Sequence, residues 1–190
     1  EAVLFDTGSK EWKEFANYPP KNAQKINFYL TDGTLKNSPS TSESEYFSDP
    51  NNPVLSSDNL KDFNGFTPRN YMSEDQRFAS SRPDVLLYET EILTDDITLG
   101  GEISVKLSVS TTGTDADWVV KLIDVYPGDE PNSNHTDKAV TLAGYQLMVR
   151  SEIMRSRFRN SFEKSEPMVP NKVTEVKFKL QDVLHTFKKG

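Results

Sequence analysis

The sequence predicts an all-β protein, a jelly-roll β-sandwich, and three observations support this prediction. Apolar and polar residues alternate along several runs in the second half of the chain, which is typical of strands with one buried face. Turn dipeptides such as Asp32-Gly33 separate runs of this kind. Few segments show helical spacing, so two packed sheets explain the pattern best.

The expected strands follow in chain order. An apolar start at 2–5 leads through a polar turn to residues 11–15, and Pro19-Pro20 ends this region, because the residue before a proline is pushed out of helical geometry. Residues 26–30 precede the Asp32-Gly33 turn and indicate a short hairpin. Further extended runs are expected at 85–90, 97–109, 118–126, 143–149 and 176–180.

These later runs differ in the faces they bury. Residues 103–109 alternate between apolar and polar side chains, which predicts a strand with one face buried and the other exposed to solvent. Residues 118–126 carry apolar side chains on both faces and therefore predict a central strand. Residues 143–155 fit either a strand or a helix, and we favour a strand through Val149.

Residues 37–83 are predicted to form a long irregular loop region. The first part is almost entirely Ser, Thr, Asn, Pro and Glu, and from residue 45 onward X-Pro and Asn-Gly pairs interrupt every candidate period. A loop of this length inside a compact domain either has a function or covers another element.

The length of 190 residues is that of about one domain, so we expect a single jelly-roll domain over 1–190. The sequence stops at a Lys-Lys-Gly turn that would normally lead into another strand. We therefore expect the sandwich to be truncated at its C-terminal end, which would leave a strand edge exposed.

The composition excludes several classes of function. Lys and Arg number 22 against 29 Asp and Glu, a net charge of −7. The excess of basic residues that is typical of proteins binding nucleic acid or anionic membranes is therefore absent. No run approaches 18 apolar residues, which predicts no membrane span. The sequence has no cysteine, and this excludes disulfides, thiolate nucleophiles and cysteine-based zinc sites.

Catalytic residues are not expected in this chain. A serine nucleophile needs a base, usually histidine, yet only His135 and His185 are present and no G-x-S-x-G motif occurs. His135 lies in a polar run, and His185 is expected to pack beside Phe187 or to face water. The Asp115-x-Asp117 spacing favours a turn over a metal site, so we expect no metal and no cofactor.

Several long motifs resemble one known family. They include SEDQRF at 73–78, RPDVL at 82–86, TGTDADWVVKLIDVYP at 112–127, LAGYQLMV at 142–149 and HTFKKG at 185–190, with GSKEW at 8–12 before them. The chain resembles the C-terminal non-catalytic domain of the X-Pro dipeptidyl-peptidase and cocaine-esterase group of serine hydrolases. Within the group it is most similar to the α-amino acid ester hydrolases and glutaryl-7-aminocephalosporanic acid acylases.

This resemblance implies a galactose-binding-domain-like jelly roll packed on an α/β-hydrolase domain of the same parent chain. That domain would carry the Ser, Asp and His of the active site, so this chain alone should be inactive. The resemblance implies a small ester or amide substrate shared between the two domains. It also implies a homo-oligomer in a bacterial extracytoplasmic location.

The resemblance also suggests a role for the irregular stretch 63–78, as one wall of the substrate pocket. We expect Tyr71 and Met72 to contact substrate, while Asp75 and Arg77 hold the loop through charged hydrogen bonds. Ordinary loop packing is the alternative for this stretch. A stand-alone carbohydrate-binding jelly roll is the alternative for the whole chain, with Trp12, Phe15 and Tyr18 as a sugar-stacking platform.

Overall fold

The computed structural model describes residues 1–58, 70–134 and 136–190, and the regular secondary structure in this part of the chain is almost entirely β-strand. It holds eight strands together with one short α-helix and one 3-10 helix. The predicted fold class is therefore confirmed. Within the described residues no helix is long and apolar enough to cross a membrane.

The described structure separates into two compact units. The first unit comprises residues 1–21, 98–122 and 149–186, and the second comprises 22–97, 123–148 and 187–190. Each unit is described by itself below. The expectation of one domain over 1–190 stays a prediction.

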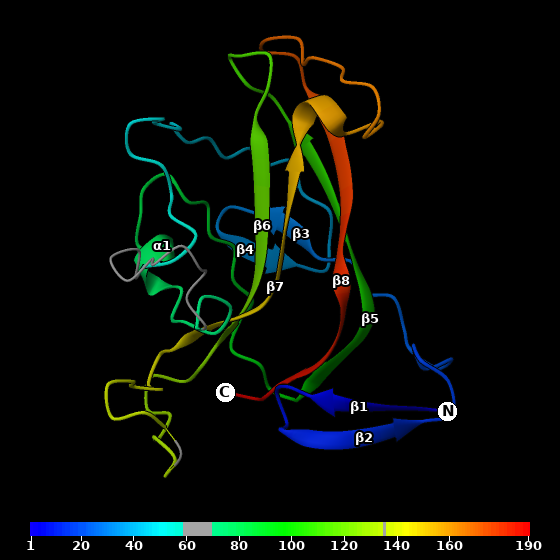
Figure 1. Cartoon of the computed structure of the whole chain (residues 1–190), viewed down its shortest axis with the longest axis vertical. Coiled ribbons are helices and arrows are strands. Elements are labelled where there is room, and N and C mark those ends of the chain that lie inside the picture. The colour runs from blue at the N-terminus through cyan, green and yellow to red at the C-terminus, as the bar shows by residue number, and fades with distance from the viewer. Residues whose placement is uncertain (59–69, 135) are drawn as a thin grey trace. The chain divides into compact units, whose positions relative to one another are not determined.

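The first unit holds a sandwich built from four long strands (Figure 1). Strand β5 (Ile97–Val109) pairs with β8 (Thr174–Phe187), and β6 (Asp117–Val125) pairs with β7 (Gln146–Arg155). Most of each strand lies in this unit. The 3-10 helix Ser156–Phe158 follows β7 directly.

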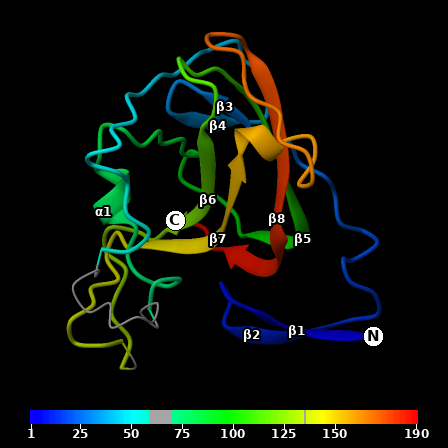
Figure 2. The same ribbon diagram turned by 45° about the horizontal axis from the view of Figure 1, so that its top comes forward.

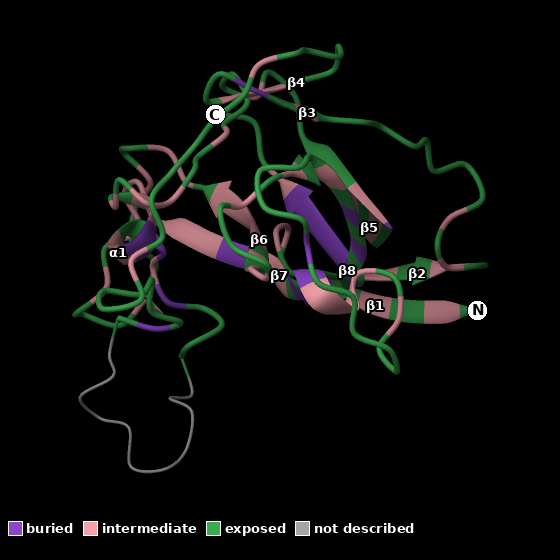
Figure 3. Ribbon diagram, turned by 90° about the horizontal axis from the view of Figure 1, so that it is seen from above, coloured by how far each residue is buried: buried purple, intermediate pink, exposed green. Residues whose placement is uncertain are grey.

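The hydrophobic core lies between these two pairs of strands. Its buried members are Met154 on β7 and Val176, Phe178 and Leu180 on β8. The partly buried residues that pack against them come from β5 and β6: Ile103, Val105, Leu107, Val109, Trp118, Val120 and Leu122. From Thr174 to Leu180 burial on β8 alternates with the period of two that a strand imposes, whereas Val183 to Thr186 are all buried (Figure 3).

An N-terminal hairpin completes the first unit. Strand β1 (Ala2–Asp6) pairs antiparallel with β2 (Glu11–Phe15), and the two run side by side in Figures 1 and 2. The turn that joins them is stabilised by Asp6, whose carboxylate accepts hydrogen bonds from the backbone nitrogens of Gly8 and Ser9 at 3.0 Å each.

The second unit holds a smaller hairpin and the α-helix. Strand β3 (Tyr29–Thr31) pairs with β4 (Thr34–Lys36), and the turn between them places Asp32 and Gly33 at positive φ, as the dipeptide predicts. Helix α1 spans Arg77–Ser80.

Several of the expected elements differ from the structure, three of them in ways that affect the fold. Residues 85–90 form no strand, because Glu89 makes only a single bridge to the β3–β4 hairpin. Strand β6 is not central: in the described structure it pairs with β7 alone, and Val119 is 53% exposed. Strand β7 extends to Arg155, well beyond the predicted end at Val149.

Candidate functional site

The strongest candidate site in the second unit is residues 70–84, which we call the anchored segment. It opens with a tight turn in which the carbonyl of Asn70 accepts hydrogen bonds from the backbone nitrogens of Ser73 and Glu74, at 2.9 and 2.8 Å. This turn places Tyr71 and Met72 at its tip, where each is 38% exposed. The sequence-predicted contact residues therefore face outward from a turn with defined geometry.

Two buried polar residues fix the base of this turn. The Glu74 carboxylate accepts hydrogen bonds from the Ser57 hydroxyl at 3.0 Å and from the Asp58 backbone nitrogen at 3.3 Å. Gln76 is 2% exposed, and its side-chain amide donates to the Glu74 carbonyl at 3.0 Å. Burial of such groups is tolerated only when they are hydrogen-bonded, so these contacts define the local path of the chain.

The start of β7 holds the same segment from the other side. The Gln76 backbone nitrogen donates to the carbonyl of Gln146 at 3.0 Å, and Asp75 makes an isolated antiparallel bridge to Leu147. The Tyr145 hydroxyl donates to the Ser73 carbonyl at 2.5 Å. Residues about 70 positions apart in sequence thus join the turn to a regular strand.

Asp75 and Arg77 form an ion pair within the anchored segment. The Arg77 Nε donates to the Asp75 carboxylate at 2.6 Å, and the backbone nitrogens of Arg77 and Gln146 donate to its other oxygen at 3.1 and 3.3 Å. Burial alone would raise the pKa of Asp75, but these hydrogen bonds outweigh it and lower the pKa below its usual value.

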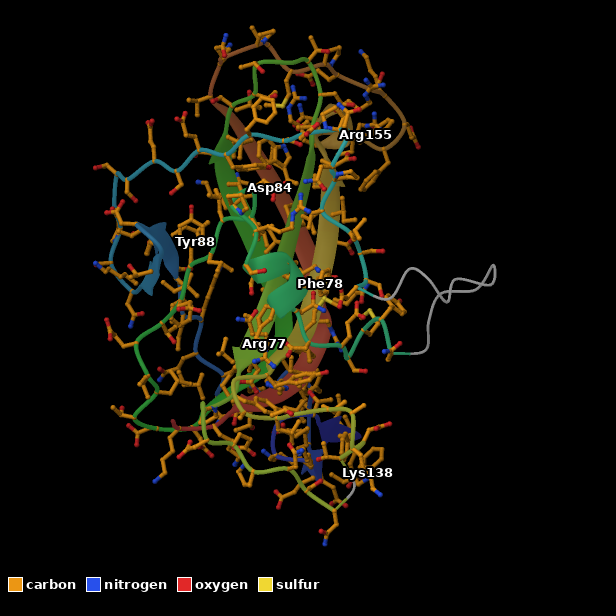
Figure 4. All side chains as sticks on the ribbon, turned by 90° about the vertical axis from the view of Figure 1, so that its left-hand side faces the viewer. Arg77, Phe78, Asp84, Tyr88, Lys138 and Arg155 are labelled. Carbon is orange, nitrogen blue, oxygen red and sulfur yellow. The ribbon has the colours of Figure 1, made fainter. Side chains whose placement is uncertain are left out.

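Arg77 projects from the first residue of α1 (Figure 4) and is about half exposed. A Cβ added at Gly144 would lie 3.7 Å from its guanidinium, so the arginine passes close to the turn that precedes β7. Gly144 has a φ of 66°, a conformation that glycine adopts without strain. The contacts of Asp75 and Arg77 are observed, while their role in anchoring the loop for activity stays a prediction.

A second ion pair secures the far end of the anchored segment. Arg82 binds both carboxylate oxygens of Asp84, at 2.8 and 2.6 Å, and donates to the carbonyl of Asn52 at 2.6 Å. The pKa of Tyr46 is raised, first by burial and then by the charge of Asp84. Residues before position 58 are therefore tied to the segment at several points.

Sequence reasoning missed most of these anchoring partners. Ser57, Tyr145 and Gln146 carry no spacing relation to the turn, and only the three-dimensional fold brings them to it. The pairing of Asp75 with Arg77 could be anticipated because the residues are two positions apart. Residues 63–69 of the predicted wall, like His135, lie outside the described residues.

His185 is the one histidine among the residues that the structure describes. His185 is fully buried, with its Nδ1 2.8 Å from the Thr7 hydroxyl, so the expectation that it faces water is corrected, while its packing beside Phe187 stays a prediction. The neighbouring Asp6 carboxylate is bonded instead to Lys13 and Thr186. We interpret His185 as structural.

The Asp115-x-Asp117 motif is engaged in ion pairs. The Asp115 carboxylate lies 2.7 Å from Arg155 Nε and 2.6 Å from Arg157 Nε. Two arginines therefore neutralise this carboxylate. Among the residues that the structure describes, no group of three or more potential ligands could hold a metal ion.

The proposed sugar platform is not formed. Trp12 lies on the outer face of the N-terminal hairpin and is 71% exposed, whereas Phe15 belongs to the opposite face. The Tyr18 hydroxyl donates to the Val183 carbonyl at 2.6 Å and accepts from the Gly101 nitrogen at 2.8 Å, which gives it a structural role. Trp12 and Tyr18 line one groove, but Phe15 does not share the exposed face of Trp12, so the three-residue platform is not formed.

The four long strands form a β-sandwich, and comparison with known proteins identifies the class of domain to which it belongs. The family model described as the X-Pro dipeptidyl-peptidase C-terminal non-catalytic domain matches residues 2–190. The chain belongs to this family.

Individual relatives are hydrolases several times longer than this chain. Cocaine esterase from Rhodococcus sp. (strain MB1 Bresler) is 36% identical over 137 residues, which cover 65% of this chain and 23% of the esterase. An aminopeptidase from a marine sediment Thaumarchaeota archaeon superposes with a TM-score of 0.86 at 33% identity. An α-amino acid ester hydrolase superposes with a TM-score of 0.82 at 32% identity. Both superpositions cover 99% of this chain and 31% of the neighbour.

Proposed function

We propose that this chain is the accessory domain of a serine hydrolase acting on small ester or amide substrates. In this proposal it braces the α/β-hydrolase domain of the same polypeptide and supplies one wall of the substrate pocket. The named relatives comprise two enzymes of ester chemistry and one aminopeptidase, which supports a substrate with a hydrolysable ester or amide bond. We include in the proposal that the parent enzyme is a homo-oligomer.

The observation that carries the pocket-wall role is the anchored segment. Its exposed tip, Tyr71 and Met72, is apolar, while its base is tied by Glu74, Gln76 and Asp75 to a strand and to a neighbouring loop. A substrate-contacting loop must hold its geometry to within a fraction of an ångström, and such loops are supported by hydrogen bonds behind the contact residues. The hydrogen bonds behind Tyr71 and Met72 support the pocket-wall role.

The experiment that tests this proposal replaces Arg77 by Ala in the full-length hydrolase. Arg77 lies outside the strands, so the fold should persist, while the loop that presents Tyr71 and Met72 loses a charged tether. We expect kcat/KM for a small ester to fall roughly tenfold, since small misplacements at a pocket are costly. Far-UV circular dichroism checks the fold.

Arg155→Ala is the matched control. Arg155 is 52% exposed and pairs with an aspartate, much as Arg77 does at 49% exposure, but it belongs to the first unit and lies outside the anchored segment (Figure 4). We expect its kcat/KM to stay at the parent value. Equal kinetics for the Arg77→Ala enzyme and the parent enzyme would contradict the pocket-wall role.

A further inference from the structure

The outer face of the N-terminal hairpin carries an apolar surface that the pocket-wall role does not use. Because residues alternate across strands, Val3 and Phe5 on β1 share this face with Trp12 on β2, and Phe5 lies directly opposite Trp12 in the register. Their exposed fractions are 56%, 42% and 71%. The Phe5 and Trp12 rings pack edge to face with centroids 5.4 Å apart.

A groove of about 320 Å³ adjoins this face within the first unit. Its lining combines the hairpin residues Val3, Phe5 and Trp12 with Tyr18, Arg150 and Asp182. Arg150 is held in place because its Nη2 and Nε donate to the Asp182 carbonyl at 3.0 and 3.3 Å. Aromatic residues and arginine beside an apolar centre are the composition typical of protein interfaces.

The inner side of the hairpin is fixed firmly to the end of β8. The fully buried Asp6 carboxylate accepts hydrogen bonds from the Thr186 backbone nitrogen at 2.9 Å and its hydroxyl at 2.5 Å, and from Lys13 Nζ at 2.6 Å. The Thr7 backbone nitrogen donates to the Leu184 carbonyl at 3.2 Å. The apolar outer face is thus presented by a rigid element, as an interface requires.

We propose that the outer face of the β1–β2 hairpin, centred on Trp12 and Phe5, is a docking surface for the catalytic domain of the same polypeptide. This inference rests on the proposed function. The matched family is a C-terminal domain, and the neighbouring structures are about three times as long, so in such proteins a catalytic part precedes the segment that corresponds to β1. That covalent connection holds the hairpin face and the catalytic part at high effective concentration.

Hydroxyl-radical footprinting of the full-length hydrolase tests the docking surface. Within the domain Trp12 and Phe162 are similarly exposed, at 71% and 80%, and Phe162 serves as the internal reference because it lies in the loop after the 3-10 helix and is not part of the hairpin. We expect Trp12 to be oxidised several-fold more slowly than Phe162, although indole is at least as reactive as a phenyl ring. Oxidation of Trp12 at the rate of Phe162 or faster would overturn the proposal.

A pair of variants supplies a second measurement. Trp12→Ser removes the centre of the surface, whereas Phe162→Ser removes a similarly exposed aromatic ring elsewhere. In the calorimetric unfolding of the full-length protein, we expect Trp12→Ser to separate the unfolding of this domain from that of the catalytic domain, and Phe162→Ser to leave the parent trace unchanged. Calorimetric traces of both variants that coincide with the trace of the parent protein would overturn the docking surface.

The two tests also separate this inference from the proposed function. Suppose that Trp12 is oxidised as fast as Phe162 while Arg77→Ala lowers kcat/KM. This result would refute the docking surface on the hairpin and support the pocket-wall role. If Trp12 is protected from oxidation while Arg77→Ala leaves kcat/KM unchanged, the docking surface is supported and the pocket-wall role is refuted.

Discussion

Asp6 shows how a single buried carboxylate can organise this chain. One of its oxygens accepts hydrogen bonds from the backbone nitrogens of Gly8, Ser9 and Thr186, and the other accepts from Lys13 and the Thr186 hydroxyl. Burial alone would raise the pKa of Asp6, yet these donors hold it far below its usual range. The ionised form is therefore strongly favoured in the folded state.

This shift predicts an acid-sensitive contribution to stability. The pKa of Asp6 is lower in the folded state than in the unfolded chain, so its contribution is fully present above the unfolded value near 3.9 and disappears as the pH falls toward the folded value. Asp6→Asn should lower the free energy of unfolding at pH 7 by about 2–3 kcal/mol. Urea denaturation at pH 7 and below pH 4 measures the free energy of unfolding of the parent protein and of the Asp6→Asn variant. The difference between these two free energies should become smaller in acid. A difference in unfolding free energy that does not change with pH would contradict a stabilising role of the ionised Asp6 carboxylate.

At the scale of elements, the close approach of the N-terminal hairpin to β8 depends on Gly8. A Cβ at this position would collide with the backbone of Thr186, whose nitrogen would lie 2.7 Å away. Backbone atoms cannot yield as a flexible side chain can. The hairpin can therefore reach its observed position only with glycine at its turn.

Gly8→Ala should accordingly weaken the packing of the hairpin against β8. We expect a loss of roughly 2 kcal/mol, in the range of overpacked sites, which corresponds to a fall in Tm of about 4–8 °C for a chain of this size. Gly128→Ala is the matched control, because no atom lies within 4 Å of the added methyl group; it should leave Tm unchanged or slightly higher. Calorimetry that gives the same Tm for both variants would refute the explanation.

The elements also show which features of the fold the sequence could predict. Strands β5 and β8 were predictable because their alternation reports one buried face, and their inward residues do form the core. Strand β6 was misjudged as central because apolar residues occupy both of its faces, although Val119 on the outer face is 53% exposed. Apolar character alone does not distinguish a face buried in the core from one left exposed.

The candidate site was predictable only where its contacts are local. Asp75 and Arg77 are two residues apart, so their ion pair follows from sequence. The bonds that join Ser73 to Tyr145 and Gln76 to Gln146 span about 70 residues and depend on the final fold. The prediction for Tyr71 and Met72 came from a family resemblance, since a tight turn with two exposed apolar residues has no distinctive spacing of its own.

For the whole molecule, the comparisons and the chemistry of the described residues both support the proposed division of labour, in which a separate domain carries the catalytic residues. The chain spans 23–31% of the length of the hydrolases it matches, and the family it belongs to is described as non-catalytic. Its described histidine is fully buried and contacts a threonine hydroxyl. A buried imidazole of this kind cannot meet a substrate from solution, which is consistent with the description of the family as non-catalytic.

The purified 190-residue chain should therefore hydrolyse a p-nitrophenyl ester no faster than buffer, and a fluorophosphonate probe for activated serines should not label it. The full-length hydrolase serves as the positive control and should react in both assays. Ester hydrolysis by the chain that is lost in a His185→Ala variant would contradict this division, because it would place a working base inside the sandwich. Activity that survives that substitution but is lost in a His135→Ala variant would contradict it in the same way.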